Sequence, residues 1–485
     1  MKDNMSNNHS TAVSPAALLE KWGFEPSVFN ADEARKETRL DSVMEYPEWF
    51  LEVLGNTKSL DFIIITGPRG TGKSSIRRSI SDHCKNRIGN DILDGSVLCI
   101  NIDHDSPKWV ENFVTNPQKP SVNYFCEEIV DQLLVAVLTY ADIESFKDKL
   151  DKKEAFFLER YIYKLQSTRP DDVSAIADRL LSKYKKLRNS EVVKDWLGIL
   201  TSFFGNQVSL ENRKIETSAI EDLPIMIQIV KKCNFDAIYI LVDEIDEYDL
   251  TTGKPGFAAE IIVPILSSMN LLEKESIGLK FFLSAPVYQR LESTSKNMSM
   301  EIRYDRTLQP DPYILEWSDD NIATMLKKRL MSYSTDKNYN SLKDFCSTDL
   351  IDIDQKIVKY SYKNPRHMIQ FCDRIVRYTA RVAYSVDFCI NEQIFNKALT
   401  DFCKWICNNI YPKDYLIAIV NFQKYEIVDL DFAQNNRISI DHTHDILDEM
   451  SRLGALKSRS ILSGEKTYTV CDPRILYLIE KEVEI

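Results

Sequence analysis

Eight consecutive residues have the types and the spacing of a loop that binds phosphate groups. The pattern G-x-x-x-x-G-K-[S/T] is matched at every fixed position by Gly67, Pro68, Arg69, Gly70, Thr71, Gly72, Lys73 and Ser74. In such a loop many backbone N–H groups point at one place, and the three glycines are expected to allow the tight curl. We expect these residues and Ser75 to contact a nucleotide, with Lys73 at the β- and γ-phosphates and the Ser74 hydroxyl ligating Mg²⁺.

Two adjacent carboxylates, Asp243 and Glu244, follow the apolar stretch 237–242, which predicts a buried strand. In enzymes with a phosphate-binding loop an Asp at a strand end holds the Mg²⁺, and we assign that role to Asp243. Glu244 is then placed to polarise an attacking water as a general base. Taken alone, the pair is equally explained as a strand end that caps a loop. The acidic residues that follow, 246, 247 and 249, are expected to be solvated and receive no catalytic role.

Two more polar residues stand at the ends of predicted elements. Ser284 ends the apolar, β-prone stretch 279–284, and Ala285-Pro286 stops it. A polar residue there is expected between the water-activating Glu and the γ-phosphate, although a plain strand-end serine explains it as well. Arg366 follows Pro365, which suits a first helical turn. From that helix start Arg366 is expected to reach a phosphate.

The elements around these residues predict an α/β protein with a P-loop NTPase three-layer core and a parallel sheet. A β-branched strand at 62–66 precedes the phosphate loop, a helix follows it, and 96–103 predicts a second core strand. Asp243 lies 170 positions after Lys73, far more than a compact core needs. We therefore predict a large helical insertion over about 105–232, which either binds a partner or only pads the core. Its apolar residues recur at helical spacing, and its basic stretch 183–188 is expected to be a solvated helix face.

These motifs resemble those of AAA+ and STAND-type P-loop ATPases. The resemblance rests on GPRGTGKS, ILVDEIDE, FFLSAP and NPRHM and covers roughly residues 20–485. Within that set the chain particularly resembles bacterial STAND-like ATPases of phage-defence and mobile-element loci. It is also similar to origin-recognition-type initiators. The resemblance implies ATP and Mg²⁺ as ligands, Ser284 as the first sensor and Arg366 as the second. AAA+ proteins often have an arginine finger that would correspond to Arg303 or Arg306 in this chain, whereas STAND proteins often lack it, and an ordinary surface ion pair also explains either arginine.

The resemblance also implies a domain order. We expect a flexible tail at 1–15, the ATPase core at 16–318, a helical lid at 319–412 and a winged-helix domain at 413–485. An aromatic residue from 16–60 is expected beside the adenine. The C-terminal stretch supports its part independently, because a helix with a Gly stop at 446–454 precedes two alternating strands at 456–461 and 466–470.

The charges of that C-terminal helix indicate whether this domain contacts DNA or protein. It carries Asp445, Asp448 and Glu449 against Arg452, and acidic groups repel DNA phosphates, although Lys457, Arg459 and Lys466 on the hairpin partly offset this. We therefore favour a protein-contacting or autoinhibitory module over a DNA reader. The stretch 441–445, with two histidines, is expected to be a helix N-terminal cap and not a metal site.

Composition is ordinary for a globular protein, with 44% hydrophobic and 28% charged residues. The net charge of −12 gives no global attraction to nucleic acid or to acidic membranes. No apolar stretch is long enough to span a membrane, and the N-terminus has no apolar signal core. The ten cysteines are scattered without paired metal spacing, so we expect them reduced and the protein cytoplasmic.

Three functions fit the sequence. The favoured one is an ATPase that acts as a molecular switch, coupling the nucleotide state to assembly or to a protein partner, in a setting such as antiviral defence. The alternative is a DNA-binding AAA+ initiator or transposition regulator. A nucleotide-bound scaffold that scarcely turns over is disfavoured by the intact Glu244. The chain carries no nuclease, protease or deaminase motif, so any such activity is expected on another chain.

Overall fold

The computed structural model describes residues 13–55, 57, 60, 62–85, 95–103, 108–116, 121–141, 146, 148–158, 161, 218–268, 277–297, 312–335, 339–382, 389–460 and 466–485. The chain forms two compact units. The sheet unit comprises Tyr46–Arg69 and Lys73–Leu315. The terminal unit comprises Met1–Glu45, Gly70–Gly72 and Glu316–Ile485.

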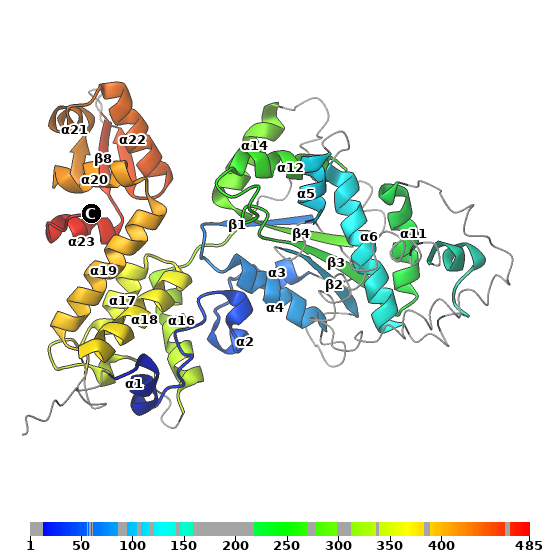
Figure 1. Ribbon diagram of the computed structural model, residues 1–485, viewed down its shortest axis with the longest axis horizontal. Helices are drawn as coiled ribbons and strands as arrows, with labels where there is room; N and C mark the ends of the chain where they lie inside the picture. Colours follow the sequence, from blue (N-terminus) through cyan, green and yellow to red (C-terminus); the bar gives the residue numbers. More distant parts are fainter. Residues whose placement is uncertain are drawn as a thin grey trace, which may run out of the picture. The chain divides into compact units, whose positions relative to one another are not determined.

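The sheet unit is built on a five-stranded parallel sheet with the order β2-β3-β4-β1-β5 (Figure 1). Its strands are β1 (Phe62–Gly67), β2 (Val97–Ile102), β3 (Ala237–Val242), β4 (Ile277–Ser284) and β5 (Tyr313–Ile314). Every residue of β3 and β4 is buried. Continuous apolar strands of this kind form where both faces of a parallel sheet are covered. The predicted α/β fold with a parallel sheet is therefore confirmed.

Helices cover both faces of the sheet. Figure 1 shows α4 (Lys73–Lys85) on one side, and α12 (Pro255–Ser267) and α14 (Ala285–Asn297) on the other. The short helix α3 (Phe50–Leu54) belongs to the same unit, and its Phe50 ring lies 5.8 Å from the ring of His83 on α4. The sheet between these layers holds its carboxyl-terminal strand ends in one row, which is where such folds place ligands.

The described parts of the long insertion are helical, as expected. They include α5 (Lys108–Thr115), α6 (Ser121–Tyr140) and α11 (Ala219–Lys231), and residues 152–158 are helical as well. Their apolar residues, including Trp109, Phe125 and Met226, belong to the same buried cluster as the sheet residues Ile240 and Phe281. These helices are thus part of the core of the sheet unit. The basic stretch 183–188 and the apolar residues 196–203 lie outside the described residues.

The terminal unit contains a helical segment and the N-terminal residues that pack on it. Its helices up to residue 412 are α1 (Pro15–Trp22), η1 (Ala34–Lys36), α2 (Leu40–Val43), α16 (Asp319–Tyr333), η5 (Lys343–Phe345), α17 (Ile353–Ser361), α18 (Pro365–Val382) and α19 (Glu392–Ile410). The rings of Trp22 and Phe24 pack on Phe345, with centroids 5.0 and 5.4 Å apart. Arg329 of α16 forms a buried ion pair with Glu37. Two of the aromatic residues of the segment 16–60, Trp22 and Phe24, are thus buried in the core of this unit.

Residues 413–485 form a module that we call the C-terminal module. Its elements are α20 (Lys413–Phe422), β6 (Glu426–Val428), α21 (Asp429–Asn436), α22 (Ile440–Arg452), β7 (Leu456–Ser460), β8 (Lys466–Val470) and α23 (Pro473–Glu480). The strands pair antiparallel in the order β6-β8-β7, as the predicted hairpin requires. Gly454 has φ +83° just after α22, which a C-terminal glycine stop explains.

The structure corrects one assignment in this module. The N-cap of α22 is Ser439, whose hydroxyl accepts a hydrogen bond from the His442 N–H at 3.2 Å. Residues 441–445 therefore lie within the helix and do not form its cap. Among the residues that the structure describes, no group of three or more His, Cys, Asp or Glu side chains has an arrangement that would hold a metal ion.

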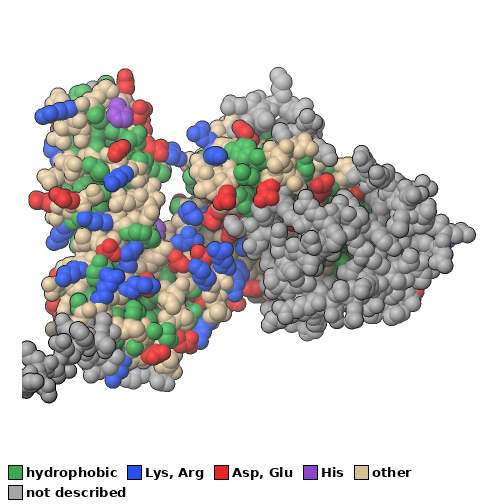
Figure 2. Space-filling model, viewed as in Figure 1, with side chains coloured by type: hydrophobic (Ala, Val, Ile, Leu, Met, Phe, Trp, Pro, Cys, Tyr) green, Lys and Arg blue, Asp and Glu red, His purple; other side chains and the backbone are tan. Residues whose placement is uncertain are grey.

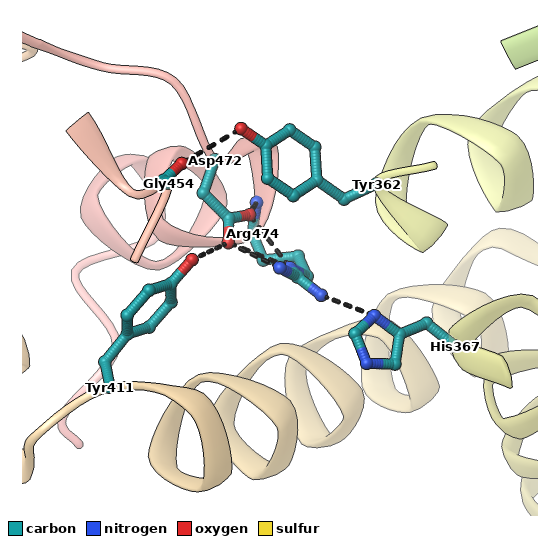
Figure 3. A network of polar contacts seen from close by, with 6 residues as sticks. All are labelled: Tyr362, His367, Tyr411, Gly454, Asp472 and Arg474. Carbon is teal, nitrogen blue, oxygen red and sulfur yellow. Dashed lines mark hydrogen bonds and ion pairs between the residues drawn. The ribbon is translucent and has the colours of Figure 1, made fainter. Parts of the chain in front are cut away.

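A buried polar network joins the C-terminal module to the helical segment (Figure 3). Arg474 donates to both carboxylate oxygens of Asp472, and Tyr411 donates to the same carboxylate at 2.7 Å. Arg474 Nη1 also lies 3.0 Å from His367 Nδ1 in the first turn of α18. Because a guanidinium only donates, the His367 Nδ1 atom is the acceptor. Above this network, Tyr362 donates to the Gly454 carbonyl at 3.0 Å.

The network predicts a pH dependence of stability. Burial and the nearby Arg474 guanidinium lower the pKa of His367 from 6.5 to about 3. Between these values the unfolded chain binds a proton at this residue that the folded chain does not, so the free energy of unfolding falls as the pH falls. The slope from one such proton is about 1.4 kcal/mol per pH unit.

We expect the free energy of unfolding of His367→Gln, measured by urea unfolding at pH 5 and pH 6, to depend less on pH than that of wild type. The difference between the two slopes should be about 1.4 kcal/mol per pH unit. The exposed His442 of α22, changed to Gln, is the matched control and should keep the wild-type slope. Equal slopes for wild type and His367→Gln would show that His367 is not held neutral in the folded protein.

All ten cysteines are free thiols in the structure. Within the described ranges, no helix has both the length and the apolar character to cross a membrane.

Candidate functional site

The candidate residues of the sheet unit lie along one edge of its parallel sheet. Asp103, Asp243 and Ser284 stand at or just after the carboxyl ends of β2, β3 and β4, which are neighbours in the sheet. Gly67 ends β1 and is paired directly with Ser284. Since the strands are parallel, their carboxyl ends meet at the same edge, and ligands of α/β sheets bind in the crevice outside that edge.

The phosphate loop runs from the end of β1 to the start of α4. Gly70 and Gly72 have φ of +85° and +99°, a conformation that strains any residue with a Cβ atom. Gly67 differs from the expectation, because it is the last residue of β1 and continues the strand pairing. Two of the three glycines, and not all three, are thus required for the curl of the loop.

Lys73 is placed where the loop and the helix meet. Its Nζ atom donates to the carbonyls of Gly67 and Pro68, at 2.9 and 3.0 Å. These bonds bring the ammonium group back over the loop that precedes it. Ser74 and Ser75 lie in the first turn of α4, where the unpaired helix N–H groups and the helix dipole favour an anion.

Other loop residues make contacts of their own. Arg69 Nε lies 3.5 Å from Glu247 Oε1, so one member of the acidic loop after β3 pairs with the phosphate loop. Thr71 is buried, and its carbonyl accepts a hydrogen bond from the indole N–H of Trp317 at 2.6 Å, a contact within the terminal unit. A cation, a helix start and a curled backbone are therefore all present in the segment predicted to bind phosphate.

The carboxylate pair has an unusual backbone. Asp243 is 2% exposed, and its Oδ1 atom accepts a hydrogen bond from the Glu244 N–H at 2.9 Å. Glu244 has φ +61°, a left-handed conformation that is rare for a residue other than glycine. Such strain persists where the surroundings impose it, and it is concentrated at functional sites. Glu244 is only partly buried, so its side chain has access to solvent.

The residues present fit a magnesium ion. Asp243 Oδ2 is buried and has no hydrogen-bond donor among the residues that the structure describes, although it lies 3.1 Å from Arg77 Nε as an ion pair. A buried carboxylate oxygen with this unused capacity is suited to a hard cation or to one of its water ligands. Asp243 and the Ser74 hydroxyl are the residues that would hold Mg²⁺, as the sequence predicts.

One residue of this site was missed by the sequence analysis. Arg77 lies on α4, one helical turn after Lys73, and pairs with both Asp103 and Asp243. Burial acts to lower the pKa of Arg77, but the carboxylates of Asp243, Asp103 and Glu244 outweigh it and raise that pKa. The one-turn spacing from Lys73 was visible in the sequence, but the identity of its partners depends on the order of the strands.

The two predicted sensors occupy different units. Ser284 is buried beside Gly67 at the end of β4. Arg366 lies in the first turn of α18, and its Nε atom donates to the Asp32 carbonyl at 3.2 Å. Within the terminal unit, a Cβ atom added to Gly70 would lie 3.3 Å from the Arg366 Cβ atom. The start of α18 therefore contacts the tip of the phosphate loop, while Arg303 and Arg306 lie outside the described residues.

Comparisons with known proteins give limited likenesses. No protein-family model matches the chain. Human Neuron navigator 2 is 35% identical over 54 residues, which are 11% of this chain and 2% of that protein. Two structures of the Aeropyrum pernix ORC2 protein, in ADPNP-ADP complexes and in the ADP form, each cover 94% of this chain, and 96% of the ORC2 chain is matched. Both are 10% identical, with TM-scores of 0.44 and 0.41. The assignment of the site therefore rests on its own geometry.

Proposed function

We propose that the protein is an ATPase of the AAA+/STAND type that acts as a molecular switch. The observation that supports this best is the row of strand ends in the sheet unit. The Asp243–Glu244 pair follows the end of β3, whose neighbour β4 ends at Ser284, and Ser284 pairs with Gly67, the first residue of the phosphate loop. A phosphate-binding loop and a strand-end acidic pair are the two parts that one Mg-nucleotide site needs.

Each residue has a distinct part in the proposed reaction. The backbone N–H groups of the loop and the Lys73 ammonium bind the phosphates of ATP. Asp243 and Ser74 would hold the Mg²⁺, which would supply positive charge to neutralise the phosphates. Glu244 accepts a proton from the attacking water, and Ser284 orients that water or the γ-phosphate. Arg366 is proposed to stabilise phosphate charge from the start of α18.

The terminal unit is proposed to carry the response to the nucleotide. Residues 319–412 correspond to the helical lid and residues 413–485 to the winged-helix domain of the proposed family. The network of Arg474, Asp472 and His367 joins the two (Figure 3). His367 directly follows Arg366 in the same helical turn. A movement of the N-terminal end of α18, caused by the proposed contact of Arg366 with phosphate, would thus be transmitted to the C-terminal module through His367 and Arg474. A protein partner or further copies of the chain would read that change.

The alternative, a DNA-binding initiator, is less well supported by the surface of the C-terminal module. A groove there is lined by Lys413, Asp414, Asp445, Asp448, Glu449 and Arg452, among others. The Arg452 guanidinium pairs with Glu449 at 2.6 Å, and Lys466 of the hairpin lies 3.7 Å from Asp448. Two of the cations that would contact DNA phosphates are thus paired with carboxylates. In Figure 2 the basic and acidic side chains of this module are interspersed.

The proposed pathway follows from the resemblance, and the proposed cell compartment follows from the cysteines. The similarity to phage-defence ATPases makes antiviral defence the pathway that we propose. Ten free thiols fit a reducing compartment, so we place the protein in the cytoplasm.

The proposal is tested by the mass of the purified Glu244→Gln protein with and without ATP and Mg²⁺, each in the presence and absence of duplex DNA. We expect a larger species on ATP and Mg²⁺ alone, because this variant is designed to hold the ATP state. An increase in mass that requires DNA would instead support the alternative function, a DNA-binding initiator. If the mass does not change in any condition and calorimetry detects no ATP binding, the ATP switch is wrong.

A further inference from the structure

Arg77 is held at the centre of the acidic edge of the sheet by three side chains. Its Nη1 atom donates to Asp103 Oδ2 at 2.6 Å and to Asn101 Oδ1 at 3.2 Å. Its Nε atom lies 3.1 Å from Asp243 Oδ2. Asn101 is fixed in turn, because its amide donates to Ser81 Oγ at 3.2 Å. Arg77 is thus a bridge between the ends of β2 and β3 and is anchored on both.

The burial of this bridge makes it costly to disturb. The side chains of Arg77, Asp103 and Asp243 are 14%, 9% and 3% exposed. Two carboxylates at neighbouring strand ends repel each other unless a cation lies between them. The guanidinium presents donors in a rigid planar fork, so it is able to contact two carboxylates in different directions at once.

The two carboxylate oxygens of Asp243 make different contacts. Oδ1 accepts from the Glu244 N–H, and Oδ2 faces Arg77 without a well-aligned hydrogen bond. Together these contacts fix the direction of the carboxylate plane and leave Oδ2 with unused acceptor capacity. Asp103, which bonds directly to Arg77, is held on the β2 side.

We propose that Arg77 is a positioning residue for the magnesium site. It holds the Asp243 carboxylate in the orientation that receives Mg²⁺ or one of its waters, and it keeps Asp103 away from that carboxylate. The inference rests on the proposed nucleotide site and adds to it a residue that acts through Asp243, without touching the nucleotide. Its consequence is that Arg77 affects the part of nucleotide affinity that depends on Mg²⁺.

The test compares ATP affinity in excess Mg²⁺ with ATP affinity in EDTA, for wild type, Arg77→Gln, Arg77→Lys and Asp103→Asn. For wild type we expect a gain in affinity on adding Mg²⁺. For Arg77→Gln the gain in affinity on adding Mg²⁺ should be about tenfold smaller than for wild type, as for the loss of one charged contact, while its affinity in EDTA stays near that of wild type. Arg77→Lys, which keeps the charge without the planar fork, should recover part of the loss. Asp103→Asn leaves the Arg77–Asp243 pair in place and should keep the gain.

The outcomes separate this inference from the proposed function. If wild type binds no ATP in either condition, the proposed function itself fails. If wild type shows the magnesium gain and Arg77→Gln shows the same gain, Arg77 does not position Asp243. If Arg77→Gln binds equally weakly with Mg²⁺ and with EDTA while wild type binds well, its role is only structural, and the inference is overturned.

Discussion

Replacing Lys73 with Ala is expected to remove most of the affinity for ATP. The Lys73 ammonium donates to the Gly67 and Pro68 carbonyls, which brings it back over the loop where the phosphates are predicted to bind. The variant loses a charge-assisted bond to phosphate, worth about 1.5–3 kcal/mol, which corresponds to about a 10- to 100-fold higher dissociation constant. Isothermal titration calorimetry with ATP and Mg²⁺ measures this change directly.

The matched control for Lys73→Ala is Arg78→Ala. Arg78 lies on the same helix and pairs with Asp82 one turn later, at 3.5 Å, and it was assigned no role in phosphate binding. It should leave the dissociation constant for ATP near the wild-type value. If both variants lose affinity equally, the loss reflects the net charge of α4 and not a contact from Lys73. If Lys73→Ala binds ATP as well as wild type, the loop is not the phosphate site.

The second large effect is expected from Glu244→Gln, which should bind ATP and fail to hydrolyse it. Gln keeps the size of the side chain but is unable to accept a proton from water at the operating pH. Loss of a general base lowers the turnover number by about 10²- to 10⁴-fold. Glu244 has φ +61°, and Gln places the same demand on the backbone, so the fold should be unchanged. Phosphate release under saturating ATP and Mg²⁺ is the measurement.

Asp249→Asn is the control for that variant. Asp249 is an exposed carboxylate of the loop that follows the pair, and it was assigned no catalytic role. It should release phosphate at the wild-type rate. A Glu244→Gln protein with wild-type turnover would show that another group accepts the proton. A variant that loses both binding and turnover would instead point to a structural role for Glu244.

Local sequence patterns determined much of the fold and of the candidate site. The loop pattern around Lys73, the strand before it and the helix after it are adjacent in the chain, and the structure places them as β1, loop and α4. The apolar runs that end in Asp243 and Ser284 became the buried strands β3 and β4. These features were predictable because each depends on neighbours in the sequence: propensity, burial pattern and the residues that end an element. The helices and the hairpin at the C-terminus followed from the same signals.

Tertiary structure alone decided the contacts between segments that lie far apart in the chain. Arg77 meets Asp103 and Asp243 only because β2 and β3 are adjacent in the sheet, an order that local patterns do not encode. The left-handed backbone of Glu244 and the extended Gly67 likewise depend on what surrounds them. The pairing of Arg474 with His367 joins residues 107 positions apart, and its burial is what lowers the pKa of that histidine. The sequence determined which residues are able to do the chemistry, and packing determined which of them are held together and in what charge state.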